Sequence, residues 1–300
     1  MPELQPESRA GFEEARVCAS PIFVLGSPRS GTTMLGWSLA QHSRLWTSGE
    51  ASVIQGIFSE KAIDAVLENA RVLGDGAFLT HEKIDRAELL GHLGVGVNAL
   101  YTSRSEDRRW IDHTPSNTLL VGVLGDLFPS AVFLHVLRDG RQVVDSMINF
   151  LTAMPDERRA SFEQAGWTIP WLDFTVACET WRDHVETASA FAGRQPDRCL
   201  TVVHGQLVAD PQKAYSEIFE FLDVSFEEPP VRYAESLRIN TSFPARGGQA
   251  TAGHFSTPWE EWSREQRATF SEIAGPTMLQ HGLANAEELQ LERLAENRVT

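Results

Sequence analysis

Residues 21–33 constrain the fold of this chain more than any other stretch. They read Pro-Ile-Phe-Val-Leu-Gly-Ser-Pro-Arg-Ser-Gly-Thr-Thr. The apolar run Ile22–Leu25 has the length and composition of a buried strand, and Gly26–Pro28 signals a turn. Leu35 and Leu39 then follow with helical spacing. A strand, a glycine-bounded loop and a helix in this order predict the first unit of a parallel α/β fold.

The loop has the G-x-x-x-x-G spacing of a phosphate-binding loop. Such a loop directs backbone N–H groups inward, and the following helix adds partial positive charge at its N-terminus. A lysine follows the second glycine in nucleoside triphosphatases, whereas Thr32 stands there in this chain and the nearest cation is Arg29. We therefore expect an anion site that does not hold the γ-phosphate of ATP or GTP; the alternative is a tight strand–helix turn that binds nothing. Its expected members are Ser27, Pro28, Arg29, Ser30, Gly31, Thr32 and Thr33.

Length, charge and cysteine usage limit the remaining classes. A chain of 300 residues, 42% of them hydrophobic, can bury a full core. The net charge of −15 argues against nucleic-acid binding and requires local cations to hold an anionic ligand. Cys18, Cys178 and Cys199 are widely spaced, which predicts reduced thiols and no metal site. The sequence lacks a run of about 20 apolar residues and a signal-peptide pattern near its start, so we expect a cytoplasmic protein without a membrane span.

Further strands and helices alternate along the chain. Strands are expected at about 44–49, 109–112, 131–137 and 199–203. The helices between and after them include 114–128, capped by Thr114 and Pro115, and a final helix over 258–281. This alternation predicts a three-layer α/β/α fold of the P-loop type, with a central, mostly parallel sheet of about five strands. We expect an N-terminal arm (1–18), a single domain (19–285) and a C-terminal tail (286–300).

In such sheets, ligands bind at the carboxyl ends of the strands. After the glycine loop, those ends offer Glu50, His113, Arg138 and His204 in chain order. His135, inside an apolar strand, is more simply a hydrogen-bonded core histidine. Residues 152–170 could form a lid or an insert that faces the acceptor. Four tryptophans are expected to serve packing or the lid rather than to stack on a base: Trp167, Trp171, Trp259 and Trp262.

A second anion-binding pattern follows the strand 131–137. Arg138 stands at the strand end and Ser146 follows eight residues later, about two helical turns on and therefore on the same side of the helix. A guanidinium fork and a hydroxyl suit a phosphate monoester. On spacing alone, an ion pair of Arg138 with Asp139 or Asp145 is an equal alternative.

Together, the loop and the Arg138–Ser146 pattern resemble the sulfotransferase family that uses 3′-phosphoadenosine 5′-phosphosulfate (PAPS). The P-R-S-G-T-T form of the loop is similar to that of bacterial and tyrosylprotein members. Val202–Leu222 resembles the family's strand and following helix with the pattern Y-E-D-L…D-P…F-L. The resemblance implies that the loop binds the 5′-phosphosulfate and that Arg138 and Ser146 bind the 3′-phosphate. Arg246, followed by two glycines, weakly resembles the family's C-terminal loop R-K-G-x-x-G, which binds a phosphate of the cofactor. Two positions depart from the pattern: His113 replaces a lysine, and His204 replaces a tyrosine that contacts adenine.

The resemblance implies transfer of a sulfuryl group from PAPS, without a metal, to a hydroxyl. Arg29 would stabilise charge in the transfer. Glu50 aligns with the catalytic glutamate of the tyrosylprotein pattern and is the favoured base, although it could instead stabilise a helix N-terminus. His113, with an ordinary pKa of about 6.5, is the second candidate base or a charge stabiliser; the alternative is a hydrogen bond to cofactor or substrate.

The expected acceptor is a small molecule, a carbohydrate or a natural product that carries a hydroxyl. Two other functions stay open: a P-loop small-molecule kinase, against which the missing lysine argues, and a non-catalytic nucleotide-binding protein. The sequence does not identify the acceptor, the contacts to adenine or the oligomeric state.

Overall fold

The computed structural model describes residues 16–51, 53–150, 169–236 and 257–289, together with residues 157, 160, 161 and 164. The central sheet follows the order β2-β3-β1-β4-β5, and all neighbouring strands run parallel. Its strands are β1 (Ile22–Leu25), β2 (Leu45–Trp46), β3 (Arg109–Asp112), β4 (Val132–Leu137) and β5 (Cys199–Val203). The predicted parallel sheet of five strands is confirmed. The second strand is shorter than the expected 44–49, because β2 pairs with β3 at two residues.

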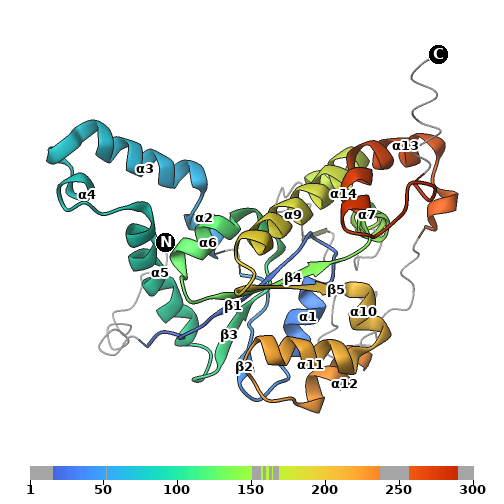
Figure 1. Ribbon diagram of the computed structural model, residues 1–300, viewed down its shortest axis with the longest axis horizontal. Coiled ribbons are helices and arrows are strands. Elements are labelled where there is room, and N and C mark those ends of the chain that lie inside the picture. Colours follow the sequence, from blue (N-terminus) through green and yellow to red (C-terminus); the bar gives the residue numbers. More distant parts are fainter. Residues whose placement is uncertain are drawn as a thin grey trace.

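Helices surround this sheet. Figure 1 shows α1, α11 and α12 on one side of the strands and α6 and α9 on the other. The α-helices are α1 (Thr32–Leu39), α2 (Val53–Ile57), α3 (Glu60–Leu73), α4 (Phe78–His81), α5 (Arg86–Thr102), α6 (Val121–Leu127), α7 (Gly140–Ile148), α9 (Phe174–Arg194), α10 (His204–Ala209), α11 (Pro211–Phe221), α12 (Glu228–Ser236), α13 (Arg264–Ile273) and α14 (Gly275–Gln280). Short 3₁₀ turns are η2 (Gly74–Gly76), η3 (Pro115–Leu120), η4 (Pro170–Leu172) and η5 (Trp259–Glu261).

The strands bury both of their faces, which explains their nearly continuous apolar sequences. Successive side chains of a strand point to opposite faces. Phe23 of β1 and Phe133 of β4 pack with α5, α6 and α9 in one core. Ile22, Val24 and Leu134 pack with α1, α11 and α12 in the other. Two cores on the two faces of one sheet confirm the predicted three layers.

The helix expected over 114–128 is divided into η3 and α6. Thr114 does not cap it with its side chain. Its hydroxyl accepts a hydrogen bond from Ala51 N (2.9 Å) and donates one to Ala51 O (3.3 Å). Thr114 and Pro115 therefore take the predicted N-cap and first positions, but the hydroxyl makes no capping bond, because it is used in a tertiary contact that ties the segment after β2 to the end of β3.

The single helix expected over 258–281 is also wrong. The chain forms η5, α13 and α14 there, and α13 ends at Ile273. Pro276 follows at the start of α14. A proline lacks the N–H of a helix interior and disfavours helical geometry at the residue before it, so the helix breaks at this point.

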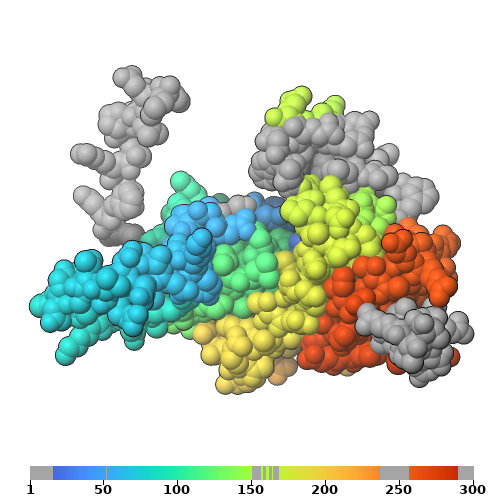
Figure 2. All heavy atoms as spheres, turned by 90° about the horizontal axis from the view of Figure 1, so that it is seen from above, coloured from blue at the N-terminus to red at the C-terminus, as the bar shows by residue number. Residues whose placement is uncertain are grey.

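Helices α3 and α4 extend away from the sheet to one side (Figures 1 and 2). Helix α5 joins this extension to the body of the protein. Its Gly94 lies against α6, where an added Cβ would be 1.8 Å from the Leu127 carbonyl oxygen. Only glycine permits this close approach, so Gly94 fixes how α5 packs on the layer above the sheet.

The remaining expectations have mixed outcomes. His135 is fully buried in β4, but neither ring nitrogen has a hydrogen-bond partner among the described residues, so the expected hydrogen bonding is wrong.

Trp171, Trp259 and Trp262 pack in the core cluster beside α9 and α13, as expected. Trp167, Arg246 and most of the expected lid lie outside the described residues. Within the described part of the chain, no helix could span a membrane.

Candidate active site

The loop between β1 and α1 has the shape of an anion cradle. Gly26 has φ +156°, and an added Cβ would lie 2.6 Å from Ser30 Oγ and 3.1 Å from the Val136 carbonyl oxygen. Thr118 of η3 anchors the loop, because its hydroxyl accepts from Gly26 N (2.8 Å) and donates to Gly26 O (3.0 Å). A side chain at position 26 would fill the concave side of the loop, so glycine is required there.

The polar groups of this cradle fit a phosphate. The hydroxyls of Ser27 and Ser30 are buried and have no hydrogen-bond partner among the described residues. An unpaired buried hydroxyl costs free energy, so each is better explained by a ligand that it binds. The N-terminus of α1 begins at Thr32, directly after Gly31, and adds the partial positive charge that an anion favours.

Arg29 lies at the centre of the site with φ +69°, a left-handed conformation that is unfavourable for a residue with a Cβ. Its Nε donates a hydrogen bond to Ser146 Oγ (3.1 Å), and its guanidinium lies 5.0 Å from the centre of the Phe150 ring. Burial and the positive charge of Arg138 lower the pKa of Arg29 to about 10, while Glu50 opposes this shift. Arg29 therefore stays charged and lies between the two predicted motifs.

Arg138, at the end of β4, completes this cationic region. Its side chain donates to the Arg29 carbonyl oxygen (3.1 Å) and to Gln142 Oε1 (3.2 Å), and Trp181 Nε1 of α9 holds its backbone carbonyl (3.1 Å). Asp139 pairs with Arg141 at 2.6 Å, and Arg138 has no ion pair within the described residues. The structure thus brings Arg138 and Ser146 close to Arg29, which is more than 100 positions away in sequence. The alternative, an ion pair of Arg138 with Asp139 or Asp145, is not formed within the described residues.

Glu50 lies on the other side of the loop. Its Oε1 accepts a hydrogen bond from Thr33 Oγ1 (3.0 Å), and the side chain is exposed. The carboxylate therefore stands at the N-terminal turn of α1, within reach of a ligand in the loop. This position suits a base, and it is equally compatible with the alternative role of stabilising a helix N-terminus.

His113 is fully buried at the end of β3. Its ring packs against α1, where a Cβ added to Gly36 would lie 2.2 Å from the ring. Neither ring nitrogen has a hydrogen-bond partner among the described residues. Burial lowers the pKa of His113 to about 4, so the expected ordinary pKa is wrong and the ring is neutral at pH 7.

The sequence analysis missed several residues that build this site. Asp112, buried beside His113, accepts hydrogen bonds from the Tyr101 hydroxyl (3.2 Å) and Thr114 N (2.9 Å), and burial raises its pKa. Thr118 and Trp181 hold the backbone of the loop and of Arg138. Thr118 is separated from Gly26 by 92 positions, so no local pattern in the sequence could have identified the pair.

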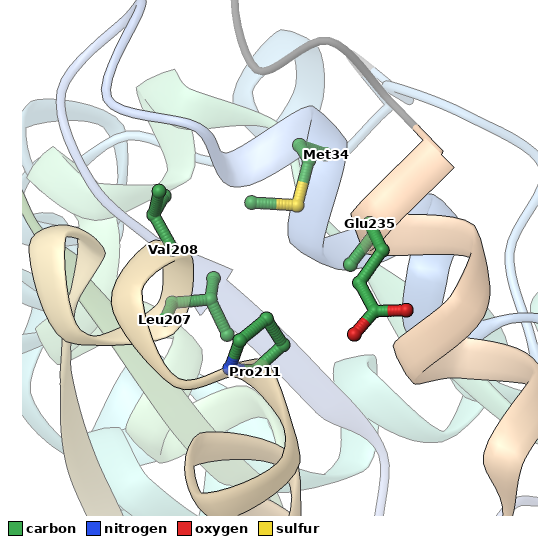
Figure 3. A pocket seen from close by; sticks show the side chains of 6 residues that line it. Met34, Leu207, Val208, Pro211 and Glu235 are labelled. Carbon is green, nitrogen blue, oxygen red and sulfur yellow. The ribbon is translucent and has the colours of Figure 1, made fainter.

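An apolar cavity of about 280 Å³ adjoins the loop (Figure 3). Met34, directly after the loop in α1, forms one wall, and Leu207 and Val208 of α10 form another. Pro211, Ala234 and Glu235 complete the lining. His204 is the first residue of α10. Its ring packs against Gly31, and burial together with the positive charge of Arg138 lowers its pKa to about 4.

A loop cradle and two half-buried arginines at the carboxyl edge of a parallel sheet define an α/β protein with a candidate anion site. The family model described as "Sulfotransferase family" matches residues 21–228. The chain therefore belongs to the sulfotransferase family.

Curated relatives agree with this family. The chain is 26% identical over 217 residues to a protein-tyrosine sulfotransferase 1 of Danio rerio, covering 72% of the chain and 56% of the relative. It is 27% identical over 221 residues to a protein-tyrosine sulfotransferase 2 of Gallus gallus, covering 72% and 54%. An uncharacterised protein of Aquifex aeolicus is 23% identical over 276 residues, covering 91% of the chain and 34% of the relative. The chain thus spans between a third and somewhat more than half of these relatives.

Solved structures support the fold. A sulfotransferase of Mycobacterium avium superposes with a TM-score of 0.51 at 16% identity, covering 89% of this chain and 77% of the other. A mouse sulfotransferase solved in complex with PAP, the desulfated cofactor, superposes with a TM-score of 0.51 at 14% identity, covering 94% and 90%. At these identities the likeness concerns the fold alone.

Proposed function

We propose that this protein transfers the sulfuryl group of PAPS to a hydroxyl of an acceptor molecule. The observation that carries the proposal is the contact between two predicted anion motifs: Arg29 of the loop bonds to Ser146, and Arg138 bonds to the backbone of Arg29. A loop alone would suit many phosphates. A second cationic group beside it suits a nucleotide with phosphates at two positions, such as PAPS.

The parts of the nucleotide can be assigned to separate groups of residues. The loop N–H groups with Ser27, Ser30, Thr32 and Thr33 would bind the 5′-phosphosulfate, and Pro28 and Gly31 shape that loop. Arg138 and Ser146 would bind the 3′-phosphate. The apolar cavity beside Met34 has room for a planar base. Arg246 stays a predicted phosphate ligand, since it lies outside the described residues.

The transfer itself needs charge stabilisation more than covalent chemistry. The bond between sulfur and the bridging oxygen of the phosphosulfate breaks, and a new bond forms from sulfur to the acceptor oxygen. The products are PAP and a sulfated acceptor. Arg29 and the N-terminus of α1 would stabilise the negative charge that develops on the leaving oxygen. The expectation that no metal takes part stays a prediction.

The acceptor hydroxyl must also lose a proton, and we assign that proton to Glu50. The carboxylate is exposed beside the loop and is oriented by Thr33. His113 is the weaker candidate, because burial holds its pKa near 4 and the ring has no exposed surface. We infer that His113 contributes a neutral ring beneath the site instead, where it can donate one hydrogen bond.

For the acceptor, we propose a small molecule, a carbohydrate or a natural product. The net charge of −15 disfavours a strongly acidic acceptor. The names of curated relatives point to protein tyrosine, so a phenolic hydroxyl belongs in any acceptor screen. A cytoplasmic location is part of the same proposal; it is supported by three cysteines that are all unpaired.

Two measurements test this function. Thermal unfolding with PAP, and separately with ADP and magnesium, should show stabilisation by PAP alone, because binding to the folded state raises the midpoint. A mass-shift screen with PAPS and candidate hydroxyl compounds should then yield a product heavier by one sulfuryl group. Stabilisation by magnesium–ADP would favour a kinase, and PAP binding without turnover on any acceptor would favour a non-catalytic nucleotide-binding protein.

A further inference from the structure

His204 meets the phosphate-binding loop from the side of β5. In the parallel pair of β4 and β5, Leu137 is level with Val203, so Arg138 and His204 leave the sheet at the same height. The His204 ring packs against Gly31, where an added Cβ would lie 2.9 Å from Cδ2 and 3.4 Å from Nε2 of the ring. The nitrogen-bearing edge of the imidazole therefore reaches the start of α1, where the loop presents its N–H groups.

The His204 ring is buried there without a hydrogen bond. Its exposed fraction is 5%. Within the described part of the chain its ring nitrogens form no hydrogen bond, and they are not among the fully buried unpaired atoms, so a ligand can reach them. The ring is also well placed to receive a ligand, because it packs against Gly31 of the loop. A largely buried imidazole that has no protein partner at the edge of an anion cradle can bind the anion with a ring nitrogen.

Charged groups from each neighbouring element act on this ring or lie near it. Arg138 at the end of β4 and burial together lower the pKa of His204 to about 4. Arg29 of the loop directs its guanidinium to Ser146. Glu235 of α12 lines the cavity opposite α10, and α10 has no other charged side chain. In the protein without nucleotide, the His204 ring is therefore neutral at pH 7.

We propose that His204 is a proton-coupled ligand of the phosphate that the loop holds, which in PAPS and PAP is the 5′-phosphate. This inference rests on the proposed function, because that function places a phosphate ester in the loop. A phosphate in the loop lies next to the ring, opposes the positive field of Arg138 and favours the charged form of the ring. The ring then takes one proton from solvent and donates its N–H to a phosphate oxygen in a charge-assisted hydrogen bond.

This role would compensate for the lysine that the loop lacks. A nucleoside triphosphatase has a permanent cation after the second glycine, whereas this chain has Thr32 there. In our proposal, His204 supplies a second cation beside the loop only while the phosphate is bound. Without nucleotide, the His204 ring is neutral and adds no positive charge close to Arg29 and Arg138, so repulsion among three cations is avoided.

The linkage has a definite sign. Nucleotide binding raises the pKa of His204, so affinity for nucleotide falls as the pH rises through the bound-state pKa and levels off above it. The phosphate ester itself takes up a proton near pH 6, which weakens binding at low pH and acts in the opposite direction. The contribution of His204 to the pH dependence of binding is therefore the difference in nucleotide affinity between the wild-type protein and a variant that lacks His204, measured over the same pH range.

Isothermal titration calorimetry of PAP binding tests the proposal. Titrations at pH 6, 7 and 8, each in two buffers that differ in ionisation enthalpy, give the number of protons taken up. The wild-type protein should take up a proton with PAP and with AMP. His204→Gln should lose that uptake and bind PAP roughly tenfold more weakly at pH 6, the loss expected for one charge-assisted hydrogen bond, with a smaller difference at pH 8.

Two further variants keep the result interpretable. His204→Phe preserves a ring against Gly31 and should also lose the proton uptake, so a folding defect of one variant does not decide the outcome. His92→Gln, on the exposed side of α5, removes a histidine far in sequence from the loop and should behave like the wild-type protein.

Each other result overturns part of the inference. Unchanged proton uptake in both His204 variants, with PAP still bound, would refute the role of His204 and leave the proposed function intact. Uptake driven by adenosine 3′-phosphate and not by AMP would refute the assignment to the 5′-phosphate. A wild-type protein that binds no PAP at any pH would contradict the proposed function and, with it, this inference.

Discussion

The two halves of the site differ in charge. The half on β4 and β5 contributes Arg138 and Ser146 at the loop, whereas two of its acidic side chains are placed elsewhere: Asp139 pairs with Arg141, and Glu235 lines the adjoining cavity. The half on β2 and β3 contains Glu50 and Asp112, and it is acidic or neutral. The loop after β1 lies between them, because β1 is the central strand, and its Arg29 feels both fields: Arg138 lowers its pKa and Glu50 raises it.

This separation has a simple physical reason. A carboxylate beside the phosphates of a nucleotide would weaken binding by repulsion, whereas a base must stand near the hydroxyl that it deprotonates. Placing the strands of each half on opposite sides of β1 satisfies both requirements. The difference predicts that changes in the acidic half alter turnover and that changes in the cationic half alter nucleotide affinity.

The largest expected effect comes from the acidic half. Glu50→Gln removes the proposed base and keeps the size of the side chain, so turnover with PAPS should fall by roughly 10² or more. PAP affinity, measured by calorimetry, should stay within about twofold if the base makes no binding contact. A variant that keeps its turnover would show that Glu50 is not the base; His113→Asn would then be the next variant to assay.

The next effect comes from the cationic half. Arg138→Ala removes a charged donor for the 3′-phosphate, so PAP should bind about 10- to 100-fold more weakly, as expected for hydrogen bonds to a charged group. AMP, which lacks that phosphate, should lose much less. Arg194→Ala is the control, because Arg194 is an exposed arginine at the end of α9. Equal losses for PAP and AMP would contradict the 3′-phosphate assignment.

Packing beneath the acidic half gives a third test. Gly36→Ala places a methyl group against the fully buried His113 ring, and overpacking of this kind costs about 1–3 kcal/mol of unfolding free energy. Gly56→Ala in α2, where the added carbon meets nothing within 4 Å, should be neutral or slightly stabilising. Urea denaturation measures both. Equal stability of the two variants would show that His113 is not held as tightly as the geometry indicates.

The smallest expected effect concerns the orientation of the base. Thr33→Val keeps the shape of the side chain and removes the hydrogen bond to Glu50, which is worth about 0.5–1.5 kcal/mol. Turnover should therefore fall by a few-fold. The part of the loss that acts through Glu50 should disappear in a Glu50→Gln background, as a double-mutant cycle shows, whereas the part due to the proposed contact with the phosphosulfate should remain. An equally large loss in that background would show that Thr33 does not act through Glu50.

Much of this site could be recognised from the chain itself. The strand, loop and helix of residues 21–33 follow from local patterns, since apolar runs, glycines and helical spacing each act over a few residues. The same holds for Arg138 and Ser146, whose spacing places them on one side of a helix. The carboxyl ends of parallel strands then predicted that Glu50, His113, Arg138 and His204 lie at one edge.

The tertiary structure decided what local patterns do not contain. Thr118 holds Gly26 across 92 positions, and Arg29 meets Ser146 across 117. The low pKa of His113 follows from its burial against α1, and Arg138 remained available because Asp139 pairs with Arg141. Local sequence determines which elements form, whereas burial, pKa and partner choice depend on residues that only the folded chain brings together.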